Sequence, residues 1–81
     1  MKEGENMNIS RRKKTFGAIT EIEKQLDVLI DIKNEEDYSR QNIPENLSET
    51  ERYEKSEEIS ETISDAVSNI KDELQQITEI L

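Results

Sequence analysis

Apolar residues recur at steps of three and four along most of this chain, the spacing that places side chains on one face of an α-helix. The first run forms a stripe of Phe16, Ile19, Ile22, Leu26, Leu29 and Ile30, which Val28 and Ile32 widen. The second run continues to the last residue through Ile59, Ile63, Ala66, Val67, Ile70, Leu74, Ile77 and Leu81. The pattern predicts two long helices, over residues 9–41 and 48–81.

The segment NIPENL between the two runs is typical of a turn. It holds the chain's one proline, Pro44, which disfavours a helical conformation of the residue before it. The next residues, Ser48 to Glu51, match a capping box, in which the serine oxygen accepts from the amide of Glu51 and the glutamate side chain bonds back to the serine amide. We therefore expect a turn over residues 42–47 and a second helix that begins at Ser48.

A connection this short makes the two helices antiparallel neighbours. The expected apolar pairs across the seam are Ile19 with Ile70, Leu26 with Ile63, and Ile30 with Ile59. The fold class is therefore all-α, a single two-helix hairpin preceded by a flexible tail over residues 1–8. Gly17 interrupts the first helix, and we interpret it as a tolerated defect or a close contact between helices.

Two helices cannot surround their own apolar stripes, so one side of the seam stays wet in a monomer. A chain of 81 residues, 31% hydrophobic, also has little material for a core of its own, and oligomerisation is a common remedy. We expect a homodimer that forms a coiled-coil-like four-helix bundle. The expected self-association residues are Phe16, Ile19, Ile22, Leu26, Leu29, Ile30, Ile59, Ile63, Val67, Ile70, Leu74 and Ile77.

Composition restricts the function. The chain has 20 acidic and 11 basic residues and a net charge of −9, which disfavours direct binding to nucleic acid and to anionic membranes. The first residues, MKEGENMN, do not resemble a signal peptide, and we expect a cytoplasmic protein. Cysteine and histidine are absent, which excludes thiolate catalysis, histidine general-base catalysis and the usual zinc sites. We therefore expect neither an enzyme nor a bound cofactor or metal.

The carboxylates have few of the features of a metal site. A di-iron site of the bundle type needs Glu-x-x-His, and residues 31–42 lack the third acidic position and the central glycine of a calcium loop. We interpret as solvated the helix faces that carry Glu21, Glu23, Asp27, Asp31, Glu57, Glu58, Glu61 and Asp65.

One basic run, Arg11 to Lys14, has no interleaved aromatic residue. It suits contacts with phosphates, and it equally suits pairing with the acidic end of the second helix, near Asp72, Glu73 and Glu79. At the other end of the hairpin, Tyr38 and Tyr53 flank the turn beside Arg40 and Arg52. We expect the two tyrosines to face each other, either as a cap on the bundle end or as a candidate partner-binding tip.

The segment DYSRQNIPENLSETERYEKSEE resembles the centre of small uncharacterised helical-hairpin proteins from phages and mobile elements of Gram-positive bacteria. The resemblance covers about a quarter of the chain. The corresponding residues are Tyr38, Asn42, Pro44, Glu45, Asn46, Leu47, Glu51, Arg52, Tyr53 and Glu54. It implies a mobile-element origin and a bacterial cytosol, and it carries no activity with it.

These observations predict a non-enzymatic acidic helical hairpin that binds protein, associates with itself, and presents its acidic surface to a partner with a basic surface. A second interpretation follows from residues 45–81, which hold eleven acids and three bases. A rod of carboxylates can imitate a phosphate backbone, so the alternative is a nucleic-acid-mimicking inhibitor of a host DNA-binding or defence protein.

Overall fold

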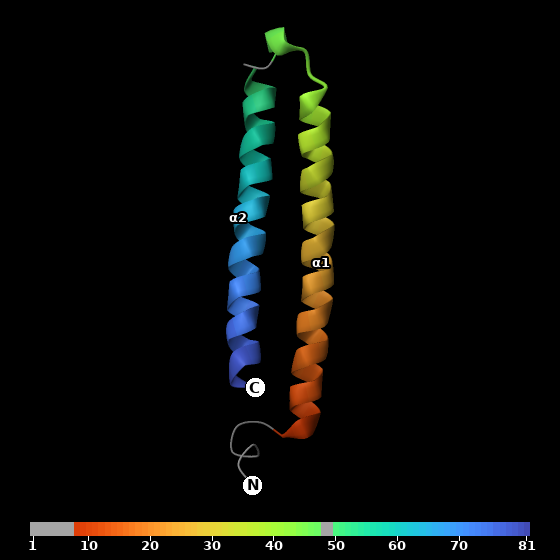
Figure 1. The fold of residues 1–81 in the computed structure, drawn as a ribbon, viewed down its shortest axis with the longest axis vertical. Helices are drawn as coiled ribbons and strands as arrows, with labels where there is room; N and C mark the ends of the chain where they lie inside the picture. The colour runs from red at the N-terminus through yellow and green to blue at the C-terminus, as the bar shows by residue number, and fades with distance from the viewer. Residues whose placement is uncertain (1–7, 48–49) are drawn as a thin grey trace.

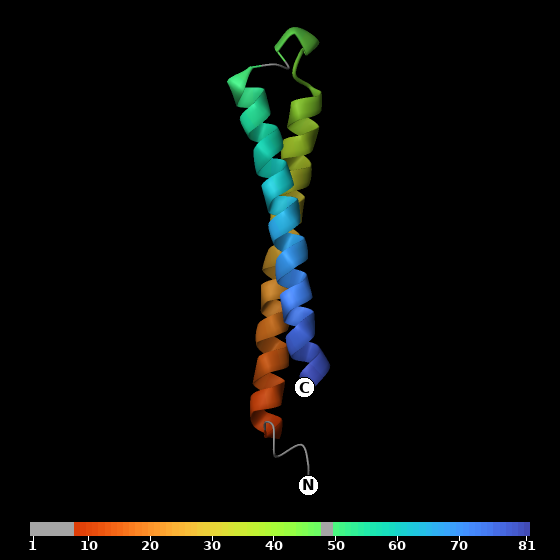
Figure 2. The ribbon, with the colours of Figure 1, turned by 90° about the vertical axis from the view of Figure 1, so that its left-hand side faces the viewer.

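The computed structural model describes residues 8–47 and 50–81, and this part of the chain is a helical hairpin. Helix α1 (Ile9–Gln41) and helix α2 (Glu51–Ile80) run side by side in opposite directions, and a short 3-10 helix, η2 (Glu45–Leu47), joins them (Figure 1). The view turned by 90° shows the two helices crossing at a shallow angle (Figure 2). The predicted all-α hairpin is confirmed. Neither long helix has an apolar stretch that would span a bilayer.

Helix α1 begins with a side-chain cap. Asn8 has an extended backbone, and its Oδ1 accepts a hydrogen bond from the amide of Arg11 at 2.8 Å, which satisfies one of the free N–H groups of the first turn. Asn8, expected in the tail, therefore belongs to the helix start, while residues 1–7 lie outside the described residues. At the other end the amide of Ile43 donates to the carbonyl of Arg40 at 3.1 Å, and Pro44 follows.

Helix α2 begins at Glu51, three residues later than expected. Thr50 is its N-cap, and Thr50 Oγ1 accepts from the amide of Tyr53 at 3.2 Å. The amide of Thr50 in turn donates to the carbonyl of Leu47, the last residue of η2, at 3.2 Å. The expected cap, Ser48, and its neighbour Glu49 lie outside the described residues.

The core is small. Within the described residues, four apolar side chains are buried, namely Ile19, Leu26, Val67 and Leu74, and the half-buried Ile30 and Ile63 pack against them. Two contacts between the helices fix the register: Ser56 Oγ donates to Glu36 at 2.6 Å near the turn, and the Arg12 guanidinium donates to the carbonyl of Leu81 at the far end.

This register places Ile19 level with Leu74, Leu26 with Val67 and Ile30 with Ile63. The expected pairs are wrong by about one helical turn. Ile59 and Ile70, which were expected in the seam, are 45% and 39% exposed. The expected pairs assumed a turn centred between residues 44 and 45, whereas the connection from Gln41 to Glu51 is centred on residue 46. When the centre of the turn moves along the sequence, the residue that lies opposite a given position moves by twice that distance. A shift of about one and a half residues in the centre therefore changes the partner by about three residues, close to one helical turn.

Gly17 makes no close contact with the other helix. A Cβ built at this position meets nothing within 4 Å. The interpretation of Gly17 as a close helix approach is therefore wrong, and the glycine is an exposed weak point of α1.

Candidate functional site

The predicted self-association residues divide into two groups. Six of them form the seam within one hairpin: Ile19, Leu26, Ile30, Ile63, Val67 and Leu74. The other six stay between 38% and 45% exposed: Phe16, Ile22, Leu29, Ile59, Ile70 and Ile77. Val28 and Ile32, expected to widen the stripe, are 47% and 48% exposed. Half of the predicted set is therefore already used inside the hairpin.

Half of the twelve exposed large apolar residues within the described part of the chain lie on one side of the hairpin. At 100° per residue, Ala18, Ile22 and Leu29 project to the same side of α1. Ala18 and Ile22 line a shallow groove together with Ile77 of α2. Nearer the turn, Ile59 of α2 lines a hollow with Glu36 of α1, and the other residues of that hollow are charged or polar, so the apolar surface ends there. We call this surface the apolar face; it consists of Ala18, Ile22, Leu29, Ile32, Ile59, Ala66, Ile70 and Ile77.

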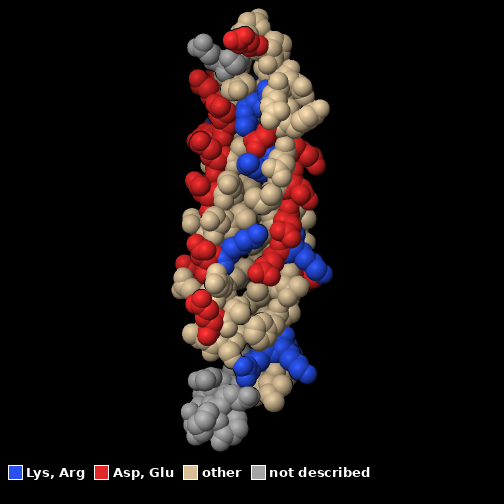
Figure 3. Space-filling view, in the orientation of Figure 1, with Lys and Arg blue, Asp and Glu red and all other residues tan. Residues whose placement is uncertain are grey.

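The opposite side of the seam is bridged by charges. Lys71 Nζ of α2 lies 3.8 Å from Asp27 Oδ1 of α1. Nearer the turn, Lys33 and Asp37 line a hollow with Glu57 and Ser64 of α2. We call this side the charged face. Figure 3 shows a surface on which acidic residues follow both edges of the hairpin with basic residues between them.

The basic run Arg11 to Lys14 lies at the open end of the hairpin, opposite the turn, where Figure 3 shows a cluster of basic side chains. The Arg12 guanidinium of this run donates a hydrogen bond to the carbonyl of Leu81, the residue that follows α2. The run thus meets the C-terminal end of α2, where the helix dipole is negative. This contact offsets its unfavourable position at the positive end of α1.

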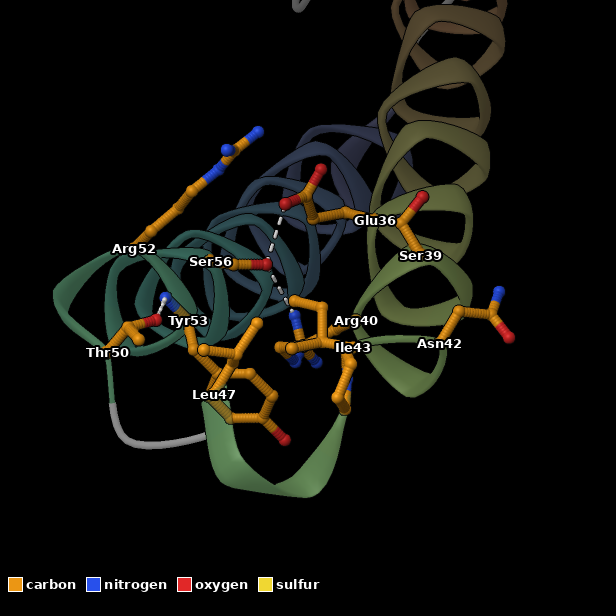
Figure 4. Close-up of a pocket in the computed structure, with 11 residues that line it drawn as sticks. Glu36, Ser39, Arg40, Asn42, Ile43, Leu47, Thr50, Arg52, Tyr53 and Ser56 are labelled. Carbon is orange, nitrogen blue, oxygen red and sulfur yellow. Dashed lines mark hydrogen bonds between the residues drawn. The ribbon is translucent and has the colours of Figure 1, made fainter.

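The turn end holds a network that joins the helices through Arg40. Arg40 Nη1 donates to Ser56 Oγ at 3.0 Å and to Ser60 Oγ at 3.1 Å, both on α2. Arg40 Nη2 donates to Asp37 Oδ1 at 2.7 Å within α1. Both serines are buried, and Ser56 Oγ donates to Glu36 in addition (Figure 4). Near the turn, this network of hydrogen bonds holds the two helices together in place of the apolar contacts that form the rest of the seam.

Asp37 forms ion pairs with two basic side chains. Lys33 Nζ lies 2.8 Å from Asp37 Oδ2, and Arg40 binds the other carboxylate oxygen. The Lys33 ammonium, the Ser60 hydroxyl and the Arg40 guanidinium hold the pKa of Asp37 well below its ordinary value. In return, the Asp37 carboxylate raises the pKa of Arg40. Asp37 and Arg40 therefore stay charged across the physiological range.

The candidate partner tip is brought together in part. Arg40, Arg52 and Tyr53 line an open hollow of about 710 Å³ beneath the turn, together with Ile43 and Leu47. In Figure 4 the Arg52 side chain points away from the other labelled side chains. The Arg40 guanidinium lies 6.0 Å from the centroid of the Tyr53 ring, within reach of a cation–π contact. Tyr38 does not line this hollow and is 68% exposed. The expectation that the two tyrosines face each other is wrong, since Tyr53 meets Arg40.

Sequence reasoning missed Lys33, Glu36, Asp37, Ser56 and Ser60 as members of one network. A signal for it was present in α2. Ser56 and Ser60 continue the seam period of Ile63 and Val67 toward the turn at the same steps of four and three. Small polar residues at seam positions need a polar partner from the facing helix, and Arg40 is the residue that reaches them.

No group of three or more acidic side chains in residues 8–47 and 50–81 is arranged to hold a metal ion. Comparisons of the chain with protein-family models, with curated proteins and with solved structures find no match. The features of the described residues that bear on function are therefore the two faces and the two ends of the hairpin.

Proposed function

We propose that this chain is a non-enzymatic, protein-binding helical hairpin whose first partner is a second copy of itself. The observation that carries the proposal is the apolar face. Its large side chains remain about two-fifths exposed, while four buried side chains make up the core of the described residues. An exposed, contiguous apolar patch of a few hundred Å² is the usual mark of an interaction surface.

The size of the face fits such a role. It extends over about 18 helical residues, or roughly 27 Å at 1.5 Å per residue, and two packed helices are ~15–20 Å wide. Each copy therefore offers roughly 500 Å², and two copies together bury about 1,000 Å², the lower limit for a specific interface. Covering this face also protects the seam residues that lie directly behind it.

Sedimentation equilibrium tests the proposal. Over about 5–500 μM the wild-type mass should rise from the 9.5 kDa of one chain to twice that value, and the helical circular dichroism signal should melt at a temperature that rises with concentration. Ile70→Glu places a charge in the centre of the apolar face and should keep the chain monomeric. The matched control, Ser64→Glu, adds the same charge to the charged face of the same helix and should dimerise normally. A fully helical wild-type monomer at the highest concentration contradicts the proposal.

A second candidate function is imitation of nucleic acid, which the rows of acidic residues along the hairpin support (Figure 3). In that case the charged face binds a basic DNA-binding protein, and added duplex DNA competes. A titration with a basic histone-like protein, at low and high salt, measures this. Loss of binding in Glu57→Gln/Glu61→Gln, with binding kept in Ile70→Glu, supports imitation. The reverse pattern supports binding through the apolar face.

We place this function in the bacterial cytosol, on the resemblance of the turn segment to proteins of phages and mobile elements.

A further inference from the structure

The middle of the apolar face carries no charge, although charges surround it. Helix geometry places Gln25, Thr62 and Asn69 along its edges. The charged residues of the same stretch, residues 22–32 and 59–70, project to the other sides of the two helices: Glu23, Lys24, Asp27, Asp31, Glu61 and Asp65. A basic partner protein would bind where the carboxylates are. A second copy also has a net charge of −9. Two such copies can meet through an uncharged face without bringing their carboxylates together.

The two ends of the hairpin differ in charge. The open end, residues 8–20 and 70–81, holds five bases and three acids, whereas the turn end, residues 33–59, holds four bases and nine acids. Two copies that stack with both turns at the same end bring like charges together at each end. Two copies that stack in opposite directions place each basic end beside an acidic one.

The apolar face is also symmetric along its length. On α1 it extends from Ala18 to Ile32, with its centre at Gln25, and on α2 it extends from Ile59 to Ile77, with its centre at Ser68. The register of the hairpin places these two centres at the same level, because Leu26 lies level with Val67. A single two-fold axis that crosses both helices at this level can therefore relate α1 to α1 and α2 to α2 of a second copy.

We propose that two hairpins stack apolar face on apolar face in antiparallel orientation, with α1 over α1 and α2 over α2 of the second copy. This inference rests on the proposed self-association and specifies its surface and direction. The axis then places Ile22 opposite Leu29 and Ile59 opposite Ile77. It places the small Ala18 and Ala66 opposite the large Ile32 and Ile70, so that volumes complement each other.

The same axis places Lys14 of one copy opposite Glu36 of the other. This pair occurs twice in the dimer, once at each end. Each copy thereby joins its basic run to the acidic turn end of its partner, and the charged faces of both copies remain outside.

Spin labels measure the direction of stacking. The chain has no cysteine, so Asn46→Cys labels the turn and Asn69→Cys labels the edge of the face near its centre. In the antiparallel dimer the two turns lie about 60 Å apart, since each is ~21 residues from the axis at 1.5 Å per residue. The Asn69 labels lie within about 20 Å of each other. Pulsed dipolar spectroscopy on each labelled variant, at a concentration where sedimentation shows the dimer, should give this pair of distances.

The outcomes separate the two proposals. A short distance between the turn labels, in a sample that sedimentation shows to be dimeric, overturns the antiparallel arrangement and leaves self-association intact. A monomeric mass at every concentration overturns self-association and the arrangement with it.

A charge variant gives an independent test, because the two directions of stacking predict opposite changes in the strength of dimerisation. Lys14→Glu faces Glu36 in the antiparallel dimer and should weaken dimerisation about tenfold, because two weak pairs of ~0.5–1 kcal/mol are lost. The control, Lys24→Glu, makes the same charge change on the far side of α1 and should weaken it less. Dimerisation that is strengthened by Lys14→Glu indicates basic ends that lie together and overturns the proposal.

Discussion

The guanidinium of Arg40 on α1 donates a hydrogen bond to Ser60 Oγ on α2 at 3.1 Å, at a point where the apolar seam has ended. Ser60 is 3% exposed, so its hydroxyl depends mainly on protein groups for its hydrogen bonds. The same guanidinium reaches Ser56 and Asp37. One side chain therefore satisfies three groups, and the turn end of the hairpin depends on it.

Replacing Arg40 by alanine should lower the free energy of unfolding by about 1–3 kcal/mol, because the buried Ser56 and Ser60 and the carboxylate of Asp37 each lose the charged donor that they share. Chemical denaturation of Arg40→Ala against wild type measures the change. Arg52→Ala, an exposed arginine on the same hollow, is the control and should change stability by less than about 0.5 kcal/mol.

A triple variant, Arg40→Leu/Ser56→Ala/Ser60→Ala, separates the missing hydrogen bonds from the missing side chain. Removing the arginine and both serines together leaves no buried hydroxyl to satisfy, and it should recover most of the stability that Arg40→Ala loses. A triple variant as unstable as Arg40→Ala shows that the network is not the cause.

Asp37 should make stability depend on pH. Its pKa is held below the ordinary value by Lys33, Ser60 and Arg40 in the folded chain, whereas the unfolded chain has a pKa of about 3.9. The unfolded state therefore binds the proton first as pH falls, and the stability from Asp37 is complete above about pH 5 and decreases below it.

Asp37→Asn isolates this contribution, because the other carboxylates are the same in both chains. Unfolding free energies at about pH 6 and pH 3 should fall more steeply in wild type than in Asp37→Asn. Equal slopes in the two proteins contradict the assigned role of Asp37.

The sequence predicts the hairpin well because the two apolar periods and Pro44 are local signals that tertiary contacts do not override. It predicts the register poorly, since Ile59 and Ile70 are as apolar as the buried Val67 and Leu74. The length of the connection between the helices decides which of these residues lie in the seam, and this length depends on the start of α2 at Glu51. The Arg40 network was missed for a related reason: without the register, nothing in the sequence places Ser56 and Ser60 opposite Arg40.

Leu26 and Leu29 test the assigned register, because they are the same residue type one turn apart on α1. Leu26 is 4% exposed and Leu29 is 38% exposed. Leu26→Ala should lower the unfolding free energy by about 2–3 kcal/mol at every protein concentration. Leu29→Ala should have a smaller effect at low micromolar concentration, where we expect the proposed dimer to dissociate. Equal losses in that dilute range mean that the seam is misplaced.

The start of α2 can be tested with two alanine substitutions in neighbouring hydroxyl residues. Thr50 caps the helix through its bond from the amide of Tyr53, so Thr50→Ala should lower stability by about 1 kcal/mol. Ser48→Ala removes the residue that the capping-box pattern favoured and should have the smaller effect. If Ser48→Ala is the more damaging of the two, the cap lies where the sequence pattern predicted it.

Gly17 offers a stabilising change. It lies within α1, and a Cβ at this position meets nothing within 4 Å. The glycine therefore provides no packing advantage, while its backbone freedom in the unfolded chain opposes helix formation. Gly17→Ala should raise the unfolding free energy by about 1 kcal/mol, and Gly17→Ser by roughly half as much, following their helix propensities. Thermal unfolding monitored by circular dichroism measures the series. A drop in stability in both variants means that another surface approaches α1 at Gly17, since added side-chain volume would then clash with it.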